Sequence, residues 1–193
     1  SSCIHGALQY GINNEKQRVL VNYNCGSMGD DLPEAIGAAA YKNNIYCVTG
    51  DGSVMMNLQE LQTIVYNNLP IKIIIFNNDG YGAIRTTCKT FFDGTNAGCD
   101  EQSGISFPDF RKISDAFGID YHCVRNISEL DDGIKWIKDK KNYCILEIYQ
   151  MIDDIKGPKV MSKMDENGVF YTPGLQEMEP SIDKILYDKL MRV

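Results

Sequence analysis

The sequence predicts an α/β fold, a doubly wound parallel sheet with helices on both faces. Short runs of β-favouring residues alternate with amphipathic segments of helical period, which is the pattern of repeated strand–helix–strand units. Two of these runs, 45–49 and 71–76, lead directly into polar loops, and a segment of helical period lies between them. A right-handed crossover would bring the carboxyl ends of both strands side by side, at the edge where open α/β sheets bind ligands.

The expected strands are five short β-favouring runs, at 19–23, 45–49, 71–76, 121–124 and 144–149. The expected helices span 3–11, 32–43, 55–68, 107–118, 128–140 and 181–191. Pro33 fits the first turn of the second of these helices, where a missing N–H costs little. Gly118 fits a helix end as a C-cap. In the helix at 55–68, apolar side chains recur at helical spacing and define one face: Met55, Leu58, Leu61, Ile64 and Val65.

The stretch from 86 to 105 has no periodicity and is rich in Gly, Asn, Thr and Asp. We therefore predict a long loop there. A loop of this length in a compact domain is usually either disordered or functional. Because it follows closely on the polar loop after 71–76, we expect it to cover a site.

Composition and charge exclude several classes of function. The net charge of −7 argues against a nucleic-acid partner, because a phosphate backbone is bound mainly through Lys and Arg. No apolar run approaches the roughly 18 residues of a membrane span, and no signal peptide is visible, so we expect a cytoplasmic protein without a membrane partner. Seven cysteines occur singly, without a CxxC pair, which favours reduced thiols over disulfides or a zinc site.

Two polar strings carry the chemistry of this chain. The first is Gly50-Asp51-Gly52-Ser53, and the second is Asn77-Asn78. We expect Asp51 and Asn78 to project from neighbouring exposed loops. Carboxylate and amide oxygens suit Mg²⁺, which usually completes its shell with phosphate. Two ordinary structural turns are the alternative, because Asp-Gly is a common turn signal.

The two strings at this spacing resemble the cofactor motif of thiamine-diphosphate-dependent enzymes, in the C-terminal cofactor-binding domain of the acetolactate synthase and pyruvate decarboxylase group. The resemblance implies two cofactors, thiamine diphosphate and Mg²⁺. It implies that Asp51, Asn78 and the carbonyl of Gly80 ligate the metal. The residues implied at the diphosphate or in the tight turn beside it are Gly52, Ser53, Tyr81 and Gly82. For Tyr81, simple packing is the alternative.

The segment 24–40 resembles a second motif of the same family, a glycine turn that leads into a helix. The resemblance implies that Gly26, Ser27 and Met28 face the cofactor: the carbonyl of Gly26 would meet the aminopyrimidine ring, and Met28 would be the apolar wedge that bends the cofactor. Ordinary core packing is the alternative for Met28. The chain departs from the family at Asp30 and Asp31, so we expect a more acidic entrance to the site.

Near the start of the chain, Ser2 and Cys3 align with a Gln-His pair that contacts the diphosphate in acetolactate synthases. Ser2 retains a hydrogen-bond donor. Cys3 is a poor replacement for His, so the resemblance is weakest at this contact.

The resemblance implies a lyase or transferase that decarboxylates a 2-oxo acid and passes the acyl-anion equivalent to a carbonyl acceptor. A keto-sugar is one such acceptor. Alternatives are a decarboxylase of pyruvate, sulfopyruvate or phosphonopyruvate, and a non-catalytic subunit of the same fold. No catalytic residue is assigned within this chain, because the glutamate that activates the cofactor is expected on a separate domain. The chain alone should therefore be inactive.

The same resemblance predicts the organisation of the chain. Residues 1–155 would form the thiamine-diphosphate and Mg²⁺ domain, with its first strand missing, and 156–193 a C-terminal arm with a terminal helix. We expect a homo-oligomer, a dimer or tetramer, or a complex with a pyrimidine-domain subunit. FAD would bind only through a domain absent from this chain.

Overall fold

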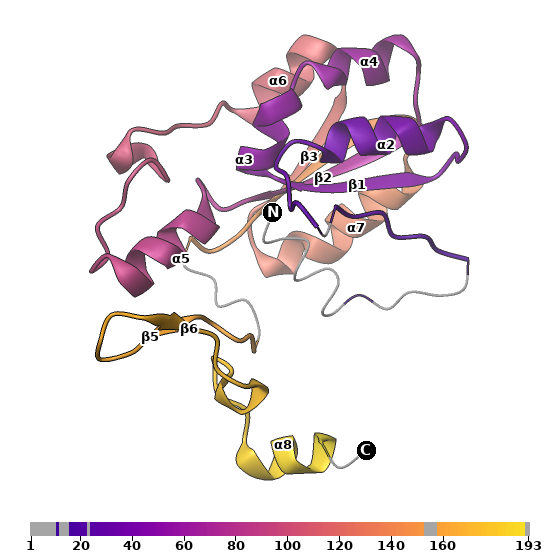
Figure 1. Ribbon diagram of the computed structural model, residues 1–193. Helices are drawn as coiled ribbons and strands as arrows, with labels where there is room; N and C mark the ends of the chain where they lie inside the picture. Colours follow the sequence, from indigo (N-terminus) through magenta and orange to yellow (C-terminus); the bar gives the residue numbers. More distant parts are fainter. Residues whose placement is uncertain (1–10, 12–15, 23, 153–157, 192–193) are drawn as a thin grey trace. The chain divides into compact units, whose positions relative to one another are not determined.

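The computed structural model describes residues 11, 16–22, 24–152 and 158–191 of the chain (Figure 1). Its contacts divide the chain into two compact units, Ser1–Ile152 and Asp153–Val193. The division lies close to the predicted boundary, but the roles predicted for the two parts as cofactor domain and arm stay predictions. In the described part of the chain, no helix is long and apolar enough to cross a membrane.

The first unit is built on a four-stranded parallel sheet. Its strands are β1 (Ile45–Gly50), β2 (Ile71–Asn77), β3 (Asp120–Val124) and β4 (Cys144–Tyr149), in the order β1-β2-β4-β3. Every neighbouring pair is parallel. The predicted α/β fold is therefore confirmed, and each of these four strands lies within one residue of its predicted range.

Helices cover both faces of this sheet, with α2, α4 and α6 on one side and α7 on the other (Figure 1). The helices of the first unit are α2 (Asp31–Ala39), α3 (Asp51–Val54), α4 (Glu60–Tyr66), α5 (Gly82–Phe91), α6 (Phe110–Phe117) and α7 (Leu130–Asp139). Short 3₁₀ turns lie at Met55–Asn57, Glu101–Ser103 and Ile127–Glu129.

Strand residues alternate between the two cores, because successive side chains of a strand point to opposite faces. Ile73 and Ile75 of β2 pack with α2 and α4, whereas Ile74 packs on the α7 side. The larger core contains Leu32, Ala35, Cys47, Val54, Leu61, Ile64, Ile71, Ile73, Ile75, Phe110, Ile119 and Ile145. The smaller one contains Val124, Ile137, Cys144 and Leu146. Because both faces are covered, β2 and β4 are mostly apolar rather than alternating between apolar and polar residues.

The strand predicted at 19–23 is wrong over its described residues, because 19–22 form no ladder. Val19 and Leu20 are 49% and 43% exposed, so this run has the composition of a strand without a buried face. The helix predicted at 55–68 begins earlier, at Asp51, directly after β1. The helix predicted at 3–11 lies almost wholly outside the described residues.

The long loop predicted at 86–105 is also wrong in its first part, because α5 continues to Phe91. In this helix Thr86, Thr87 and Thr90 donate their hydroxyls to the carbonyl four residues earlier. β-Branched residues have low helix propensity, so the sequence carried little signal for this helix. The irregular stretch that remains contains a single 3₁₀ turn, capped by the side chain of Asp100.

The second unit, described by itself, contains little regular structure. A two-stranded antiparallel ribbon pairs β5 (Lys163–Met164) with β6 (Phe170–Tyr171). A 3₁₀ turn (Leu175–Glu177) and the helix α8 (Lys184–Leu190) follow. Asp183 caps α8 by accepting from the backbone N–H of Leu186, in agreement with the terminal helix predicted there.

Gly37 offers a test of the packing around α2. It lies inside this helix, and a Cβ added there would have no heavy atom within 4 Å. Gly37→Ala should therefore raise the free energy of unfolding by about 0.5–1 kcal/mol, because alanine loses less backbone entropy on folding. Urea denaturation would measure it. An unchanged or lower stability would mean that the exposed face of α2 is covered in the folded protein.

Candidate active site at the carboxyl end of the sheet

The two polar strings of the sequence meet at the carboxyl ends of β1 and β2. The strands are paired in register with Gly50 opposite Phe76, so the start of α3 lies beside the loop that follows β2. One carboxylate oxygen of Asp51 accepts from the N–H of Gly80 at 2.9 Å. The other accepts from the N–H of Gly52, also at 2.9 Å. The structure thus brings the Asp51 carboxylate and the loop 78–80 together.

Asp51 is not the exposed loop residue that we expected, because its relative exposure is only 3%. Burial raises the pKa of this carboxyl, while hydrogen bonds from the backbone of Gly80, Gly52 and Asn78, and the charge of Arg85, lower it. Among the described residues it has no salt bridge. A buried carboxylate that has backbone donors but no paired cation is a suitable ligand for a metal ion.

Glycine is required at two positions of the loop after β2. Gly80 has a φ of +140°, and a Cβ there would lie 2.2 Å from the carbonyl oxygen of Cys99. A Cβ at Gly82 would lie 2.5 Å from the side-chain nitrogen of Asn78. The chain therefore passes close to the carbonyl of Cys99 at Gly80 and close to the side chain of Asn78 at Gly82. Only glycine leaves room for these two contacts.

Tyr81 packs against the first turn of α3. A Cβ at Gly52 would lie 2.3 Å from the Tyr81 ring, so the ring occupies the space above this glycine. On another side the ring makes an edge-to-face contact with Phe107, with centroids 5.4 Å apart. The packing predicted as the alternative for Tyr81 is therefore present, and the residue also lines the cavity described next.

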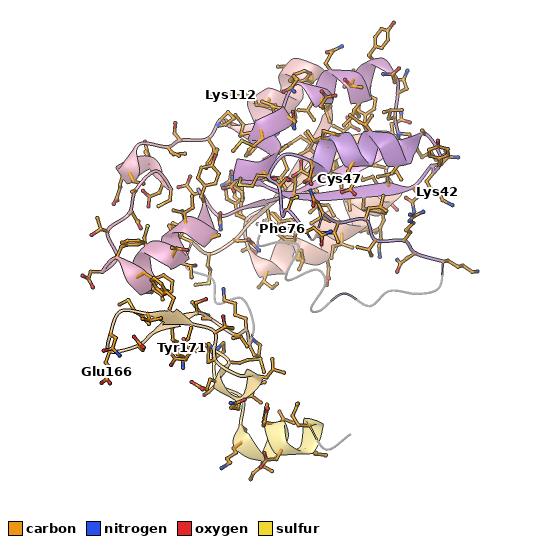
Figure 2. The ribbon with its side chains drawn as sticks, viewed as in Figure 1. Lys42, Cys47, Phe76, Lys112, Glu166 and Tyr171 are labelled. Atoms are coloured by element: carbon orange, nitrogen blue, oxygen red, sulfur yellow. The ribbon has the colours of Figure 1, made fainter. Side chains whose placement is uncertain are left out.

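An open cavity is lined by the first turn of α3 and by the loop after β2. Met28 lies at its wall and is 40% exposed, so it is not part of the core. Phe76 of β2, labelled in Figure 2, also lines the cavity. Apolar groups make up most of the wall. The lining residues are Met28, Gly50, Asp51, Gly52, Ser53, Phe76, Asn78, Gly80, Tyr81, Gly82, Ala83, Ile84 and Gln150.

The glycine turn before α2 is tied to α3 through Ser53. The hydroxyl of Ser53 accepts from the N–H of Gly29 at 3.0 Å and donates to the carboxylate of Asp31 at 2.6 Å. Thr49 donates to the same carboxylate, and Asn22 donates to Asp30 at 2.8 Å. Hydrogen bonds to these two carboxylates fix the turn. The more acidic entrance expected from Asp30 and Asp31 stays a prediction.

Gly26 and Ser27 are exposed at this turn, and Gly26 has a φ of +56°. The lining of the cavity includes neither residue, although it includes the adjacent Met28. Of the three residues predicted to face the cofactor from this turn, the structure thus brings only Met28 to the cavity. Ser2 and Cys3 lie outside the described residues.

A buried carboxylate on β4 supports the loop from the other side. Glu147 is 1% exposed and accepts from the side-chain amide of Asn77 at 2.6 Å and from the hydroxyl of Tyr121. Asn77 in turn accepts from the N–H of Asp79 at 2.9 Å. Burial, followed by the hydrogen bond and charge of Glu147, raises the pKa of Tyr121. Asn77 thus connects β4 to the loop that carries Asn78.

Comparison with known proteins agrees with this geometry. Residues 2–148 match the family described as “Thiamine pyrophosphate enzyme, C-terminal TPP binding domain”. The chain belongs to this family. The resemblance seen in the two polar strings is therefore confirmed.

Similar curated proteins are acetolactate synthase large subunits. That of Porphyra purpurea is 40% identical over 112 residues, which cover 57% of this chain and 19% of the relative. That of Cyanidium caldarium is 41% identical over 125 residues, which cover 64% of this chain and 21% of the relative. The isozyme 2 large subunit of Escherichia coli (strain K12) is 35% identical over 115 residues, covering 58% and 20%. The aligned segment thus spans about a fifth of these relatives.

The oxygen atoms at the cavity fit the cation of a thiamine-diphosphate-binding domain. A carboxylate, an amide oxygen and a backbone carbonyl are the hard oxygen donors that Mg²⁺ prefers, and Asp51, Asn78 and Gly80 supply one of each. Ser53 lies beside them, although its hydroxyl is engaged by Asp31. The N–H of Gly52 donates to Asp51, so it is not free in this structure.

Reading the sequence missed Asn77, Glu147 and Arg85 as parts of this site. A signal for Glu147 was present, because it is the one charged residue in the apolar run of β4. Asn77 was recognised as part of a motif, but its role in holding the loop was not. For Arg85 there was no signal, since a basic residue early in a helix is ordinarily a surface residue.

Tyr121→Phe tests the support beneath the loop. The variant should lower the free energy of unfolding by about 1–3 kcal/mol, because the buried Glu147 carboxylate loses a donor. Chemical denaturation would measure the change. Tyr41→Phe is the matched control, since Tyr41 is 87% exposed, and it should leave stability unchanged. Equal stability of both variants would contradict the buried contact.

Proposed function

We propose that this chain is the thiamine-diphosphate- and Mg²⁺-binding domain of an acetolactate-synthase-like enzyme. Such an enzyme decarboxylates a 2-oxo acid and transfers the acyl-anion equivalent to a carbonyl acceptor. The observation that carries the proposal is the hydrogen bond that joins the buried Asp51 carboxylate to Gly80, at a cavity that Asn78 also lines. Membership of the family, and relatives that are acetolactate synthases, support it.

In this proposal Asp51 and Asn78 bind Mg²⁺ through their side chains, and Gly80 through its carbonyl. Gly52 and Ser53 meet the diphosphate beside the metal, and Gly82 gives the loop its tight path. Met28 lies at the apolar wall of the cavity, together with Phe76 and Ile84, where the cofactor's rings need support. When bound, thiamine diphosphate supplies the carbanion that attacks the 2-oxo acid, and the protein's part is to hold and orient it.

The proposal assigns the rest of the chemistry to parts beyond this chain. The glutamate that activates the cofactor would come from a pyrimidine-binding domain, in another subunit or elsewhere in a longer polypeptide. This agrees with an aligned segment that spans about a fifth of the relatives. Groups that recognise the acceptor would lie there as well, and a dimer or larger assembly would bring both parts together.

Asp51→Asn tests the metal ligand, because the amide keeps the shape of the side chain and removes its charge. In the full enzyme, the affinity for thiamine diphosphate in the presence of Mg²⁺ should fall at least about 100-fold. Loss of a residue that only hydrogen-bonds to a metal ligand already lowers metal affinity about 10–100-fold. Without cofactor, the melting temperature should fall slightly, because the asparagine amide has one oxygen where the carboxylate accepts from two backbone N–H groups, and removal of the buried charge offsets only part of this loss. Titration calorimetry and a thermal melt would measure both.

The control is Asp115→Ala, which removes an exposed carboxylate from α6. It should bind the cofactor as the unaltered enzyme does. Equal affinity of the Asp51→Asn enzyme would refute this metal ligand, and no binding heat from the unaltered enzyme would refute the proposed function. Acetolactate formed from pyruvate would support the transferase, whereas free aldehyde alone would favour a decarboxylase.

A further inference from the structure

Arg85 is a buried arginine directly behind the loop after β2. It lies in the first turn of α5 and is 7% exposed. Its guanidinium donates to the carbonyl of Asn78 at 2.7 Å and to that of Asp79 at 2.9 Å. A third, longer contact of 3.4 Å reaches the carbonyl of Ile152. Two consecutive peptide groups of the loop are therefore held by one side chain.

The burial of this guanidinium is costly for the fold. Arg85 forms no salt bridge among the described residues, and its buried Nε has no hydrogen-bond partner there. A buried charge of this kind is usually retained only when it is paired, and an apolar side chain of similar size would pack at lower cost. Stability alone therefore does not explain Arg85.

The held segment has an unusual backbone. Asp79 has a φ of +56°, a conformation uncommon for residues other than glycine. The guanidinium binds the carbonyls on both sides of the Asp79 N–H and Cα, so it fixes this conformation. From the opposite side, Asp51 accepts from the N–H of the next residue, Gly80. The loop is thus held at consecutive peptides from two directions.

The three carbonyls of the loop differ in their hydrogen-bond partners. Those of Asn78 and Asp79 are occupied by Arg85. Among the described residues, the carbonyl of Gly80 has only a 3.2 Å contact with the N–H of Gly82, two residues on. Of the three, it is the one left for another partner.

We propose that Arg85 is a positioning residue for the cation of the cofactor, because it binds the Asn78 and Asp79 carbonyls and leaves the Gly80 carbonyl and the Asn78 side chain for the metal. This rests on the proposed function. Arg85 does not itself touch the cation or the cofactor. A planar guanidinium spans two carbonyls at once, which the single ammonium of lysine cannot reproduce.

The test uses Arg85→Lys and Arg85→Met in the full enzyme, with thiamine diphosphate titrated in the presence of Mg²⁺ or of Ca²⁺. Mg²⁺ requires near-ideal octahedral geometry, whereas Ca²⁺ accepts irregular shells. Both variants should weaken the binding of thiamine diphosphate in the presence of Mg²⁺ by about 10–100-fold, which is the usual effect of removing a residue that holds a metal ligand in place. Binding with Ca²⁺ should weaken less, so the preference for Mg²⁺ over Ca²⁺ should fall about tenfold.

The matched control is Arg111→Met, which removes an exposed arginine whose guanidinium lies 4.7 Å from the centre of the Tyr121 ring. It should leave both affinities and their ratio unchanged. A merely structural role for Arg85 would lower the melting temperature without changing the ratio, and that result would overturn the inference. So would unchanged or tighter binding with Mg²⁺.

Three outcomes distinguish failure of the inference from failure of the proposed function. If neither Arg85 variant folds, Arg85 is a determinant of the fold and the inference fails. If the unaltered enzyme binds no thiamine diphosphate with either cation, the proposed function itself fails. Cofactor binding by the unaltered enzyme together with an unchanged cation ratio in the variants would refute only the inference.

Discussion

The hydrogen bond from the Gly80 N–H to the Asp51 carboxylate is the contact on which the whole site depends. It joins the first residue of α3 to the loop after β2, 29 residues further along the chain. The bond is possible because β1 and β2 are parallel neighbours in register, which brings their carboxyl ends to one edge of the sheet. The crossover through α3 and α4 is what makes this parallel pairing possible. A change in strand register would separate Asp51 from Gly80 even if every helix still formed.

Charged side chains are buried beneath this edge of the sheet, where an apolar core would be more stable. Asp51, Arg85 and Glu147 are each less than a tenth exposed. Each is bonded to the loop after β2 or to Asn77 at its start. Burying a charge lowers the stability of the fold unless the charged group is fully hydrogen-bonded or paired. Three such groups around one short loop therefore indicate that the conformation of this loop has been favoured over stability.

The cavity combines polar and apolar groups. Asp51 and Asn78 line it together with the apolar side chains of Met28, Phe76 and Ile84. A mixed lining of this kind is typical of a site for a small ligand that has both polar and apolar parts. The glycine turn that carries Met28 is tied to α3 by Ser53, so this part of the wall is fixed relative to Asp51.

The sequence by itself determined the fold class, four of the strands and the pair of polar strings, because these depend on local features. β-Branched runs predict strands, and Gly-Asp-Gly and Asn-Asn lie at strand ends within a few residues. Local patterns gave a wrong prediction at 19–22, where the β-favouring run has no buried face. They also gave a wrong prediction in α5, where threonines of low helix propensity form part of a helix.

Only the tertiary structure decided which side chains hold the loop. Glu147 lies 70 residues from Asn77, and their contact follows from the pairing of β2 with β4. Arg85 looks like a surface residue in the sequence, and its burial depends on how α5 packs behind the loop. Such contacts arise from strand order and helix packing, which are properties of the folded chain as a whole rather than of any short segment.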